Sequence, residues 1–314
     1  MARTVRGPDA EWAGRIEAML RHKGQPWLWQ DTELLRRAVP LEARFFILER
    51  RGAVFANLLL SEHAGVALLG HVWTEPADRG GGASSQLMEL ALADFAARGG
   101  RAIFLGTEFG GTPWHYYGRR GFVPVEPGSG CMARYFQPQA EFEAGWFHSA
   151  ASEIVALDWT HWPTAAPLFL SPGGGSVRLA GQRLHGRMLC EEPLLPLIRA
   201  QREAADGVRV ASALATPGTA AVLGLAARSP HPLFPGAEIV DVFCHPRWWD
   251  RAGDLLDSLR PFPSRAVAFC DTGSHPRRRF LEQRGFRRQG SLPGWLPATP
   301  GSPTRGDLDV LVRH

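Results

Sequence analysis

The second half of this sequence repeats the first, and that repeat constrains the fold more than any other feature. The apolar segment Val72-Trp73-Thr74-Glu75-Pro76 has a counterpart in Val242-Phe243-Cys244-His245-Pro246. Downstream, each half carries another apolar segment and then a Gly-Phe pair, at Gly121 and Gly285, which lie 164 residues apart in a chain of 314. A chain of this length also favours two domains. The sequence therefore predicts two copies of one fold, over residues 1–147 and 148–314.

Within the first copy, apolar periodicity predicts helices over residues 9–22, 31–37 and 84–97, and a short helix near 113–120. Segments 43–50, 53–61 and 65–74 are typical of strands, and the short breaks between them suit antiparallel hairpins. Further strands are predicted at 102–107, 121–123 and 132–136, with an aromatic loop at 26–29. The expected fold class is α/β, with two tandem domains that each contain a mixed, mostly antiparallel sheet flanked by helices.

The composition indicates a globular chain rather than a disordered or membrane-spanning one. Hydrophobic residues make up 45% and charged residues 21%, which is enough to form a core. The net charge of +4 is too weak to indicate nucleic-acid binding. No apolar run is long enough to cross a bilayer, and the N-terminus has no apolar signal core. We therefore expect a soluble, cytoplasmic protein that binds neither membrane nor nucleic acid.

The four cysteines are far apart in the sequence and none belongs to a Cys-x-x-Cys pair. They are Cys131, Cys190, Cys244 and Cys270. Scattered cysteines in a cytoplasmic chain of this length are most simply buried, reduced thiols. No paired Cys/His spacing of the kind that binds zinc is present, so no metal is expected.

The strongest chemical signal is a glycine-rich segment between a predicted strand and a predicted helix. It reads Pro76-Ala77-Asp78-Arg79-Gly80-Gly81-Gly82-Ala83-Ser84. Glycines let backbone N–H groups approach a ligand, and the N–H groups at a helix start are unpaired and partly positive. Together they favour a pocket for a pyrophosphate, supplemented by Arg79. The segment has neither the G-x-G-x-x-G of a dinucleotide site nor the GK[ST] of a P-loop. Taken alone, a flexible glycine loop explains it equally well.

Two motifs together resemble the GNAT N-acetyltransferase superfamily. Residues 79–84 are similar to the R-x-x-G-x-G/A loop of that family, and Tyr117-Gly118-Arg119-Arg120-Gly121-Phe122 resembles its Tyr-x-x-x-Gly-Phe signature. The resemblance covers about residues 5–136, and Ser84 departs from it where Gly or Ala is usual. It implies that acetyl-coenzyme A is the co-substrate, bound by Arg79, Gly80, Gly81, Gly82, Ala83 and Ser84. It also implies that the backbone of Val72, Trp73 and Thr74 lines the pantetheine and the thioester.

The second copy keeps the framework but loses the loop. Two indoles, Trp248 and Trp249, stand where glycines would be needed, and Leu281 occupies the position of Tyr117. Leucine has no proton to give. We therefore predict a degenerate GNAT-like domain that packs against the first domain and shapes the acceptor site. The stretch Pro172-Gly173-Gly174-Gly175 is expected to be a loop inside this copy.

The resemblance implies direct transfer of an acyl group from the thioester to an amine in a ternary complex. A strand-end N–H near Thr74 would polarise the carbonyl, and Tyr117 is the candidate acid, because a phenol stays protonated at pH 7. A base must also accept the amine proton, directly or through water. Glu108 and His71 are preferred for that role over Glu75 and His115. An alternative for Tyr117 is an aromatic anchor for the short helix.

The acceptor is not specified by these motifs, and a small-molecule amine and a protein amine both fit. Trp27 and Trp29 either border the acceptor site or cap the core, and Trp114 is equally ambiguous. Two other functions stay open: a non-catalytic acyl-coenzyme A sensor, and an acyltransferase that depends on transfer RNA. The mild charge argues against the second of these. The protein is expected to be a monomer or a homodimer.

Overall fold

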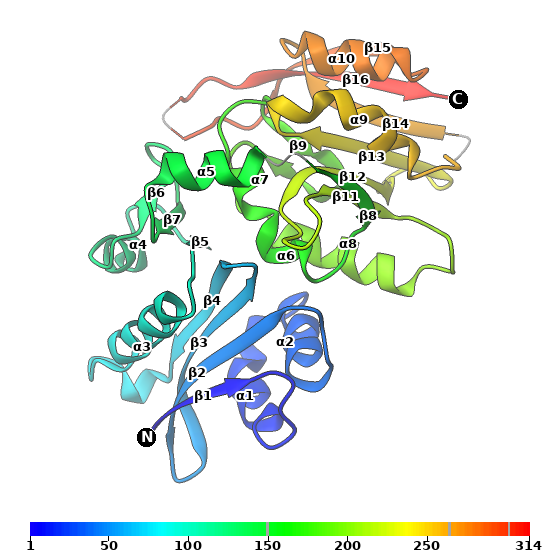
Figure 1. The fold of residues 1–314 in the computed structure, drawn as a ribbon. Helices are drawn as coiled ribbons and strands as arrows, with labels where there is room; N and C mark the ends of the chain where they lie inside the picture. Colours follow the sequence, from blue (N-terminus) through cyan, green and yellow to red (C-terminus); the bar gives the residue numbers. More distant parts are fainter. Residues whose placement is uncertain (149–150, 263–264, 301) are drawn as a thin grey trace.

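The structure is a computed structural model that describes residues 1–148, 151–262, 265–300 and 302–314. These residues form two seven-stranded mixed sheets flanked by helices, which confirms the predicted fold class (Figure 1). The two sheets occupy separate halves of the molecule. The predicted boundary between residues 147 and 148 stays a prediction, since the neighbouring residues 149–150 lie outside the described ones.

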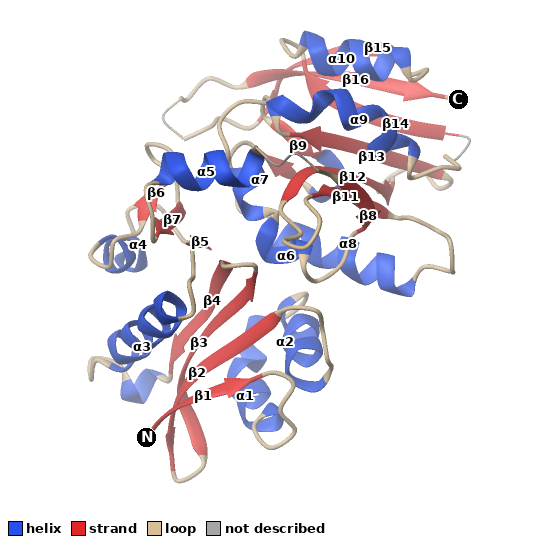
Figure 2. Ribbon diagram, in the orientation of Figure 1, coloured by secondary structure: helices blue, strands red, loops and turns tan. Residues whose placement is uncertain are grey.

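The first sheet has the strand order β1-β2-β3-β4-β5-β7-β6. Its strands are β1 (Ala2–Arg6), β2 (Glu42–Arg50), β3 (Ala53–His63), β4 (Val66–Thr74), β5 (Ala102–Gly106), β6 (Val123–Pro124) and β7 (Cys131–Tyr135). The helices are α1 (Ala13–Leu20), α2 (Trp27–Arg36), α3 (Ala83–Ala97), α4 (Thr112–Gly118) and α5 (Gln139–Phe147). Helix α3 covers one face of the sheet, and α1 and α2 cover the other (Figure 2).

The second sheet has the strand order β15-β16-β14-β13-β12-β11-β8. Its strands are β8 (Glu153–Ala156), β11 (Ala211–Ala215), β12 (Val222–Pro230), β13 (Ala237–Cys244), β14 (Arg265–Asp271), β15 (Arg287–Leu296) and β16 (Gly306–Arg313). The helices are α6 (His161–Thr164), α7 (Ala166–Leu170), α8 (Glu191–Glu203), α9 (Ala252–Asp257) and α10 (His275–Gln283). The short strands β9 (Val177–Leu179) and β10 (Leu184–His185) form a separate hairpin.

Most predicted elements are present, with three differences. The aromatic segment at 26–29 is not a loop, because helix α2 begins at Trp27. The Trp29 ring stacks on Trp159 of the second half and the Trp27 ring packs edge-on against His71; this packing outweighs the modest helix propensity of tryptophan. Strand β1 was not predicted; it pairs with β2 at the edge of the sheet. The strand predicted at 121–123 is limited to the two residues of β6.

The repeat is visible in the connections as well as in the sequence. Strand β4 leads through the 3₁₀ turn η2 (Pro76–Asp78) into α3, and β13 leads through η4 (Pro246–Arg251) into α9. Strands β4 and β5 are parallel but pair only from Val66 to Leu68, so β4 continues to Thr74 with no strand on that side. Strands β13 and β14 likewise pair only from Ala237 to Ile239. Each copy therefore contains a wedge between two parallel strands.

The two halves share one apolar core. Helix α6 packs on β3 and β4, and Trp29 of α2 stacks on Trp159 with ring centroids 5.3 Å apart. Arg202 of α8 forms an ion pair with Glu33 of α2. A single cluster of buried side chains runs from the first sheet into the helices of the second half. This continuity fixes the position of α8 relative to the first sheet.

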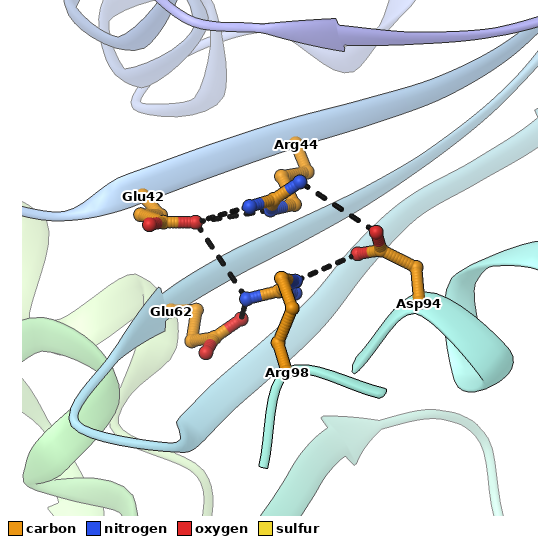
Figure 3. Close-up of polar contacts among 5 residues, drawn as sticks. All are labelled: Glu42, Arg44, Glu62, Asp94 and Arg98. Carbon is orange, nitrogen blue, oxygen red and sulfur yellow. Dashed lines mark hydrogen bonds and ion pairs between the residues drawn. The ribbon is translucent and has the colours of Figure 1, made fainter. Parts of the chain in front are cut away.

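An ion-pair network anchors the C-terminal end of α3 to the first sheet (Figure 3). Arg98, directly after the helix, lies 2.6 Å from the carboxylate of Glu62 on β3 and 2.9 Å from that of Asp94. The buried Arg44 of β2 joins Asp94 to Glu42 at 3.6 and 2.7 Å. Burial raises the pKa of Glu62, so its ionised form depends on Arg98.

Replacing Arg98 with alanine should cost about 1–3 kcal/mol of unfolding free energy, because it leaves the buried Glu62 carboxylate without its partner. A raised pKa in the folded state means that stability is lost as the pH rises through that pKa. The deficit should therefore be larger at pH 8 than at pH 5, as measured by denaturant unfolding. Arg36→Ala, which removes an exposed pair with Glu17, is the control and should leave stability near wild type. An equal deficit at both pH values would contradict the role of Glu62.

Candidate active site

The glycine-rich segment forms an open pocket of backbone N–H groups at the start of α3. Gly80 and Gly82 have φ angles of 83° and 79°, in the left-handed region that glycine adopts readily. The first helical hydrogen bond runs from the N–H of Gln86 to the carbonyl of Gly82, so the N–H groups of residues 83–85 precede the helical ladder. Such a cluster attracts an anion.

The predicted cofactor residues come together around this pocket. A cavity of about 200 Å³ is lined by Thr74, Asp78, Arg79, Gly80, Gly82, Ala83, Ser84 and Ser85. The Thr74 and Ser84 hydroxyls lie 3.1 Å apart, which ties the end of β4 to the start of α3. Arg79 donates from Nε to the Thr74 carbonyl at 3.1 Å, and its guanidinium lies 4.7 Å from the Trp73 ring centroid. Val72 and Trp73 are half-buried on β4, and Gly81 is exposed beside the cavity.

Two hydrogen bonds that stabilise the start of α3 were not predicted from the sequence. The Tyr116 hydroxyl donates to the Ser84 carbonyl at 2.7 Å, and Arg120 donates to the Ser85 hydroxyl at 2.7 Å. The Arg120 guanidinium also lies 3.7 Å from the centroid of the Tyr116 ring. Arg120 lies within the Tyr-x-x-x-Gly-Phe motif and Tyr116 directly precedes it, so the motif was the sequence signal that could have pointed to them. Helix α4 therefore fixes the end of α3 that presents the N–H groups.

Strand β4 bulges at His71, beside the wedge. The pairing of β4 with β3 shifts between Gly70 and Trp73, and His71 has a φ angle of 54°. A side chain in this region costs energy, and such strain gathers at functional positions. Asn57 stabilises the bulge by donating to the His71 carbonyl at 3.0 Å. The His71 ring is buried, with Nδ1 3.2 Å from Asp31 of α2.

The other two predicted catalytic residues lie in very different surroundings. Tyr117 is 8% exposed and sits between the rings of Tyr116 and Phe122. Burial raises its pKa, and the charges of Tyr116 and Glu191 raise it further, so the phenol keeps its proton at neutral pH. Glu108 is exposed on the loop after β5. Among the described contacts, none joins Glu108 to His71 or Tyr117.

A larger cavity, of about 500 Å³, opens between the two halves of the chain. The first half contributes Trp27, Thr107, Ser129 and Cys131, and the second half contributes Leu189 and Glu191, among others. Burial raises the pKa of Glu191 to about 7. Glu191 is far from the motifs in sequence, and nothing in the sequence pointed to it as a site residue. Of the three ambiguous tryptophans, only Trp27 lines this cavity; Trp29 packs on Trp159, and Trp114 donates to the Ser129 carbonyl.

The corresponding wedge of the second copy is partly occupied by its own chain. The N–H groups of Ser176 and Val177 donate to Asp271 of β14 at 2.7 and 3.0 Å. Those of Ala180 and Gly181 donate to Asp241 of β13 at 2.9 and 2.8 Å. We call residues 173–181 the plug.

The glycines of the predicted loop at 172–175 let the plug approach the wedge closely. A Cβ atom on Gly174 would lie 2.6 Å from the Phe243 ring, and one on Gly175 would lie 2.5 Å from Asp271. Strand β13 also pairs with β12 without a register shift, so it lacks the bulge of β4. Trp248 donates to the Phe147 carbonyl, and Trp249 lines a cavity of about 530 Å³ beside the plug. The plug thus occupies the part of the second wedge beside Asp241 and Asp271.

Similarity to known proteins is found among solved structures. No family model matches the sequence, and no curated protein matches it. Among solved structures, the ribosomal-protein-S18-alanine N-acetyltransferase from Escherichia coli is 13% identical, over 52% of this chain and 93% of that one, with a TM-score of 0.36. A GNAT family acetyltransferase from Brucella melitensis in complex with acetyl-CoA is 21% identical, over 44% and 90%, with a TM-score of 0.33.

A ribosomal-protein-alanine N-acetyltransferase from Brucella melitensis gives a similar match, with 15% identity over 51% of this chain and 98% of that one and a TM-score of 0.38. Likeness at this level says nothing about activity or acceptor.

In the part of the chain that the structure describes, no helix has the length and apolarity needed to cross a bilayer. That part also contains no cluster of three or more His, Cys, Asp or Glu side chains placed to hold a metal ion.

We expect one donor site per chain, and Gly81→Trp should abolish it. Gly81 does not have a positive φ angle, and a Cβ atom there would meet only the Asp78 carbonyl oxygen, at 3.7 Å. The indole should therefore obstruct the N–H pocket without disturbing the fold. Isothermal titration with acetyl-coenzyme A should give a stoichiometry near one for the wild type and no binding for the variant, with thermal unfolding as the control for folding. A stoichiometry near two would show that the plug does not close the second wedge.

Proposed function

We propose that the first domain is an N-acyltransferase that transfers the acyl group of acetyl-coenzyme A directly to an amine. The observation that carries the proposal is the continuity of the wedge with the N–H pocket. An unpaired edge of β4 runs from Leu69 to Thr74 and ends at the exposed N–H groups of α3. A ligand with amides along an extended arm and a diphosphate at its end fits that combination.

The donor would lie along β4. Its pyrophosphate would accept hydrogen bonds from the N–H groups of Gly80, Gly81, Gly82, Ala83 and Ser84, with Arg79 beside them. The pantetheine amides would pair with the free backbone groups of Val72, Trp73 and Thr74, as an added strand would. This arrangement places the thioester toward the bulge at His71. A backbone N–H there would polarise its carbonyl and stabilise the negative charge that develops on the oxygen.

The reaction needs one proton removed and one proton supplied. The amine nitrogen attacks the thioester carbon, the carbon–sulfur bond breaks, and the thiolate leaves. Tyr117 would give its proton to the thiolate, and a base would take the proton from the amine. Among the predicted bases, His71 lies at the bulge and Glu108 lies on the exposed loop after β5. Holding both reactants in one complex supplies much of the rate by proximity.

The proposal is tested by titrating the protein with acetyl-coenzyme A and then following thiol release with a panel of amines. We expect binding, and release of free coenzyme A that depends on the amine. Binding without release for every amine would instead indicate a sensor of acyl-coenzyme A. Absence of binding would remove the proposal altogether.

Tyr117→Phe should lower kcat at least tenfold and leave the Kd for acetyl-coenzyme A unchanged, because the phenol supplies a proton and holds no part of the donor. Tyr116→Phe is the matched control. It removes the hydrogen bond to the Ser84 carbonyl, so it should weaken donor binding with a smaller effect on kcat. Steady-state kinetics and calorimetry separate the two effects. Near-normal turnover in Tyr117→Phe would assign that residue to packing alone.

A further inference from the structure

We infer that Glu191, on the second domain, is the base that takes the proton from the acceptor amine. The degenerate half of the chain would then complete the active site of the first half. This inference rests on the proposed acyl transfer and names a residue for its unassigned step. It departs from the two bases expected from the sequence, Glu108 and His71.

The first argument is position. Glu191 is the first residue of α8, and its carboxylate lies directly against β4: a Cβ atom on Gly70 would be only 2.8 Å from Oε1 of Glu191. Gly70 immediately precedes the bulge at His71, where β4 has already separated from β5. The absence of a side chain at Gly70 thus lets a carboxylate from the second half lie against β4, where that strand has left β5.

The second argument is that this position is fixed. Trp162 of α6 donates from its indole N–H to the Glu191 carbonyl at 2.7 Å. Two residues earlier, the N–H of Leu189 donates to the Cys131 thiol of β7 at 3.3 Å. Further along α8, Arg202 forms its ion pair with Glu33 of the first domain. The start of α8 is therefore tied to both halves, as a catalytic group requires.

The third argument is that the Glu191 carboxylate is free to accept a proton. Within the described chain, no hydrogen bond or ion pair reaches the Glu191 carboxylate. Two other glutamates at the interface, Glu33 and Glu126, are committed to Arg202 and Arg187. Glu191 instead lines the cavity of about 500 Å³ between the halves, and neither His71 nor Glu108 lines it. His71 is enclosed with Asp31, and Glu108 is exposed.

The electrostatic surroundings suit a base that works near neutral pH. Burial raises the pKa of Glu191 to about 7; the charges of His71 on β4 and of Lys23 after α1 lower it, and Glu192 raises it. The Glu191 charge in turn acts on Tyr117 of α4, Cys131 of β7 and the adjacent Cys190. A base with a pKa near the working pH accepts a proton most effectively.

The cavity also indicates the class of acceptor. Its volume suits a small molecule, and the Trp27 ring, Leu189 and Pro297 give it apolar walls. Glu191 stands at the β4 end, where an amine would meet the thioester. We therefore expect a small primary amine with an apolar body to be the acceptor.

The test compares Glu191→Gln with Glu203→Gln, which makes the same change at the exposed end of the same helix, where Glu203 pairs with Arg199. Below a pKa near 7 the carboxylate is protonated and cannot accept a proton, so wild-type kcat/KM should fall as the pH drops through 7. Glu191→Gln should lose about 100-fold or more in kcat/KM at pH 7.5. Its kcat/KM should no longer fall as the pH drops through 7, and its Kd for acetyl-coenzyme A should be unchanged. Glu203→Gln should match the wild type.

Two further variants guard against a change in folding. Glu191→Asp should recover part of the rate, because it retains the carboxylate. Gly70→Ala leaves Glu191 intact but places a methyl group where its carboxylate lies, so it should lower kcat with little effect on donor binding. Wild-type rates and an unchanged pH profile in Glu191→Gln would overturn the inference and leave acyl transfer standing. Failure of the wild-type protein to acylate any amine, small or on a protein, despite binding the donor, would overturn the proposed function and this inference together.

Discussion

The separation of two parallel strands is the constraint on which the rest of the structure depends. Backbone N–H and C=O groups that lose a neighbouring strand must find other partners or water. Strand β4 leaves β5 after Leu68, and strand β13 leaves β14 after Ile239. Each copy of the fold therefore contains a strand edge that needs to be satisfied. The two copies meet that need in different ways, and this difference separates a candidate active site from a supporting domain.

In the second copy, the chain itself enters the wedge and is held there by side chains of the two strands. The plug supplies backbone N–H groups to Asp241 and Asp271, and the buried Arg277 donates to the Val177 carbonyl. Glycine is required at residues 174 and 175 because the plug passes so close to Phe243 and Asp271. In the first copy the edge stays open. The bulge at His71 and the glycines before α3 can then bind a ligand.

The open site is held from both ends and from both halves of the chain. The start of α3 is braced by Tyr116 and Arg120, and its far end is held by Arg98 in the ion-pair network. Helix α8 reaches across from the second half and sets Glu191 against Gly70. In this arrangement the duplicated copy contributes a side chain to the first one, in addition to apolar contact. That contribution gives a physical role to a copy whose own wedge is partly occupied by the plug.

The sequence by itself determined what depends on local spacing. Period-two apolar runs and their short breaks predicted β2, β3 and β4, and the glycines after Pro76 predicted the N–H pocket, because both follow from neighbouring residues. The similar order of motifs in the two halves predicted the duplication. Tertiary structure decided what depends on residues far apart in the chain. Glu191 lies near no motif in sequence, and only the packing of α8 against β4 brings it to Gly70. The plug likewise reads as a plain glycine loop until the partners of its N–H groups, Asp241 and Asp271, are placed on the two separated strands.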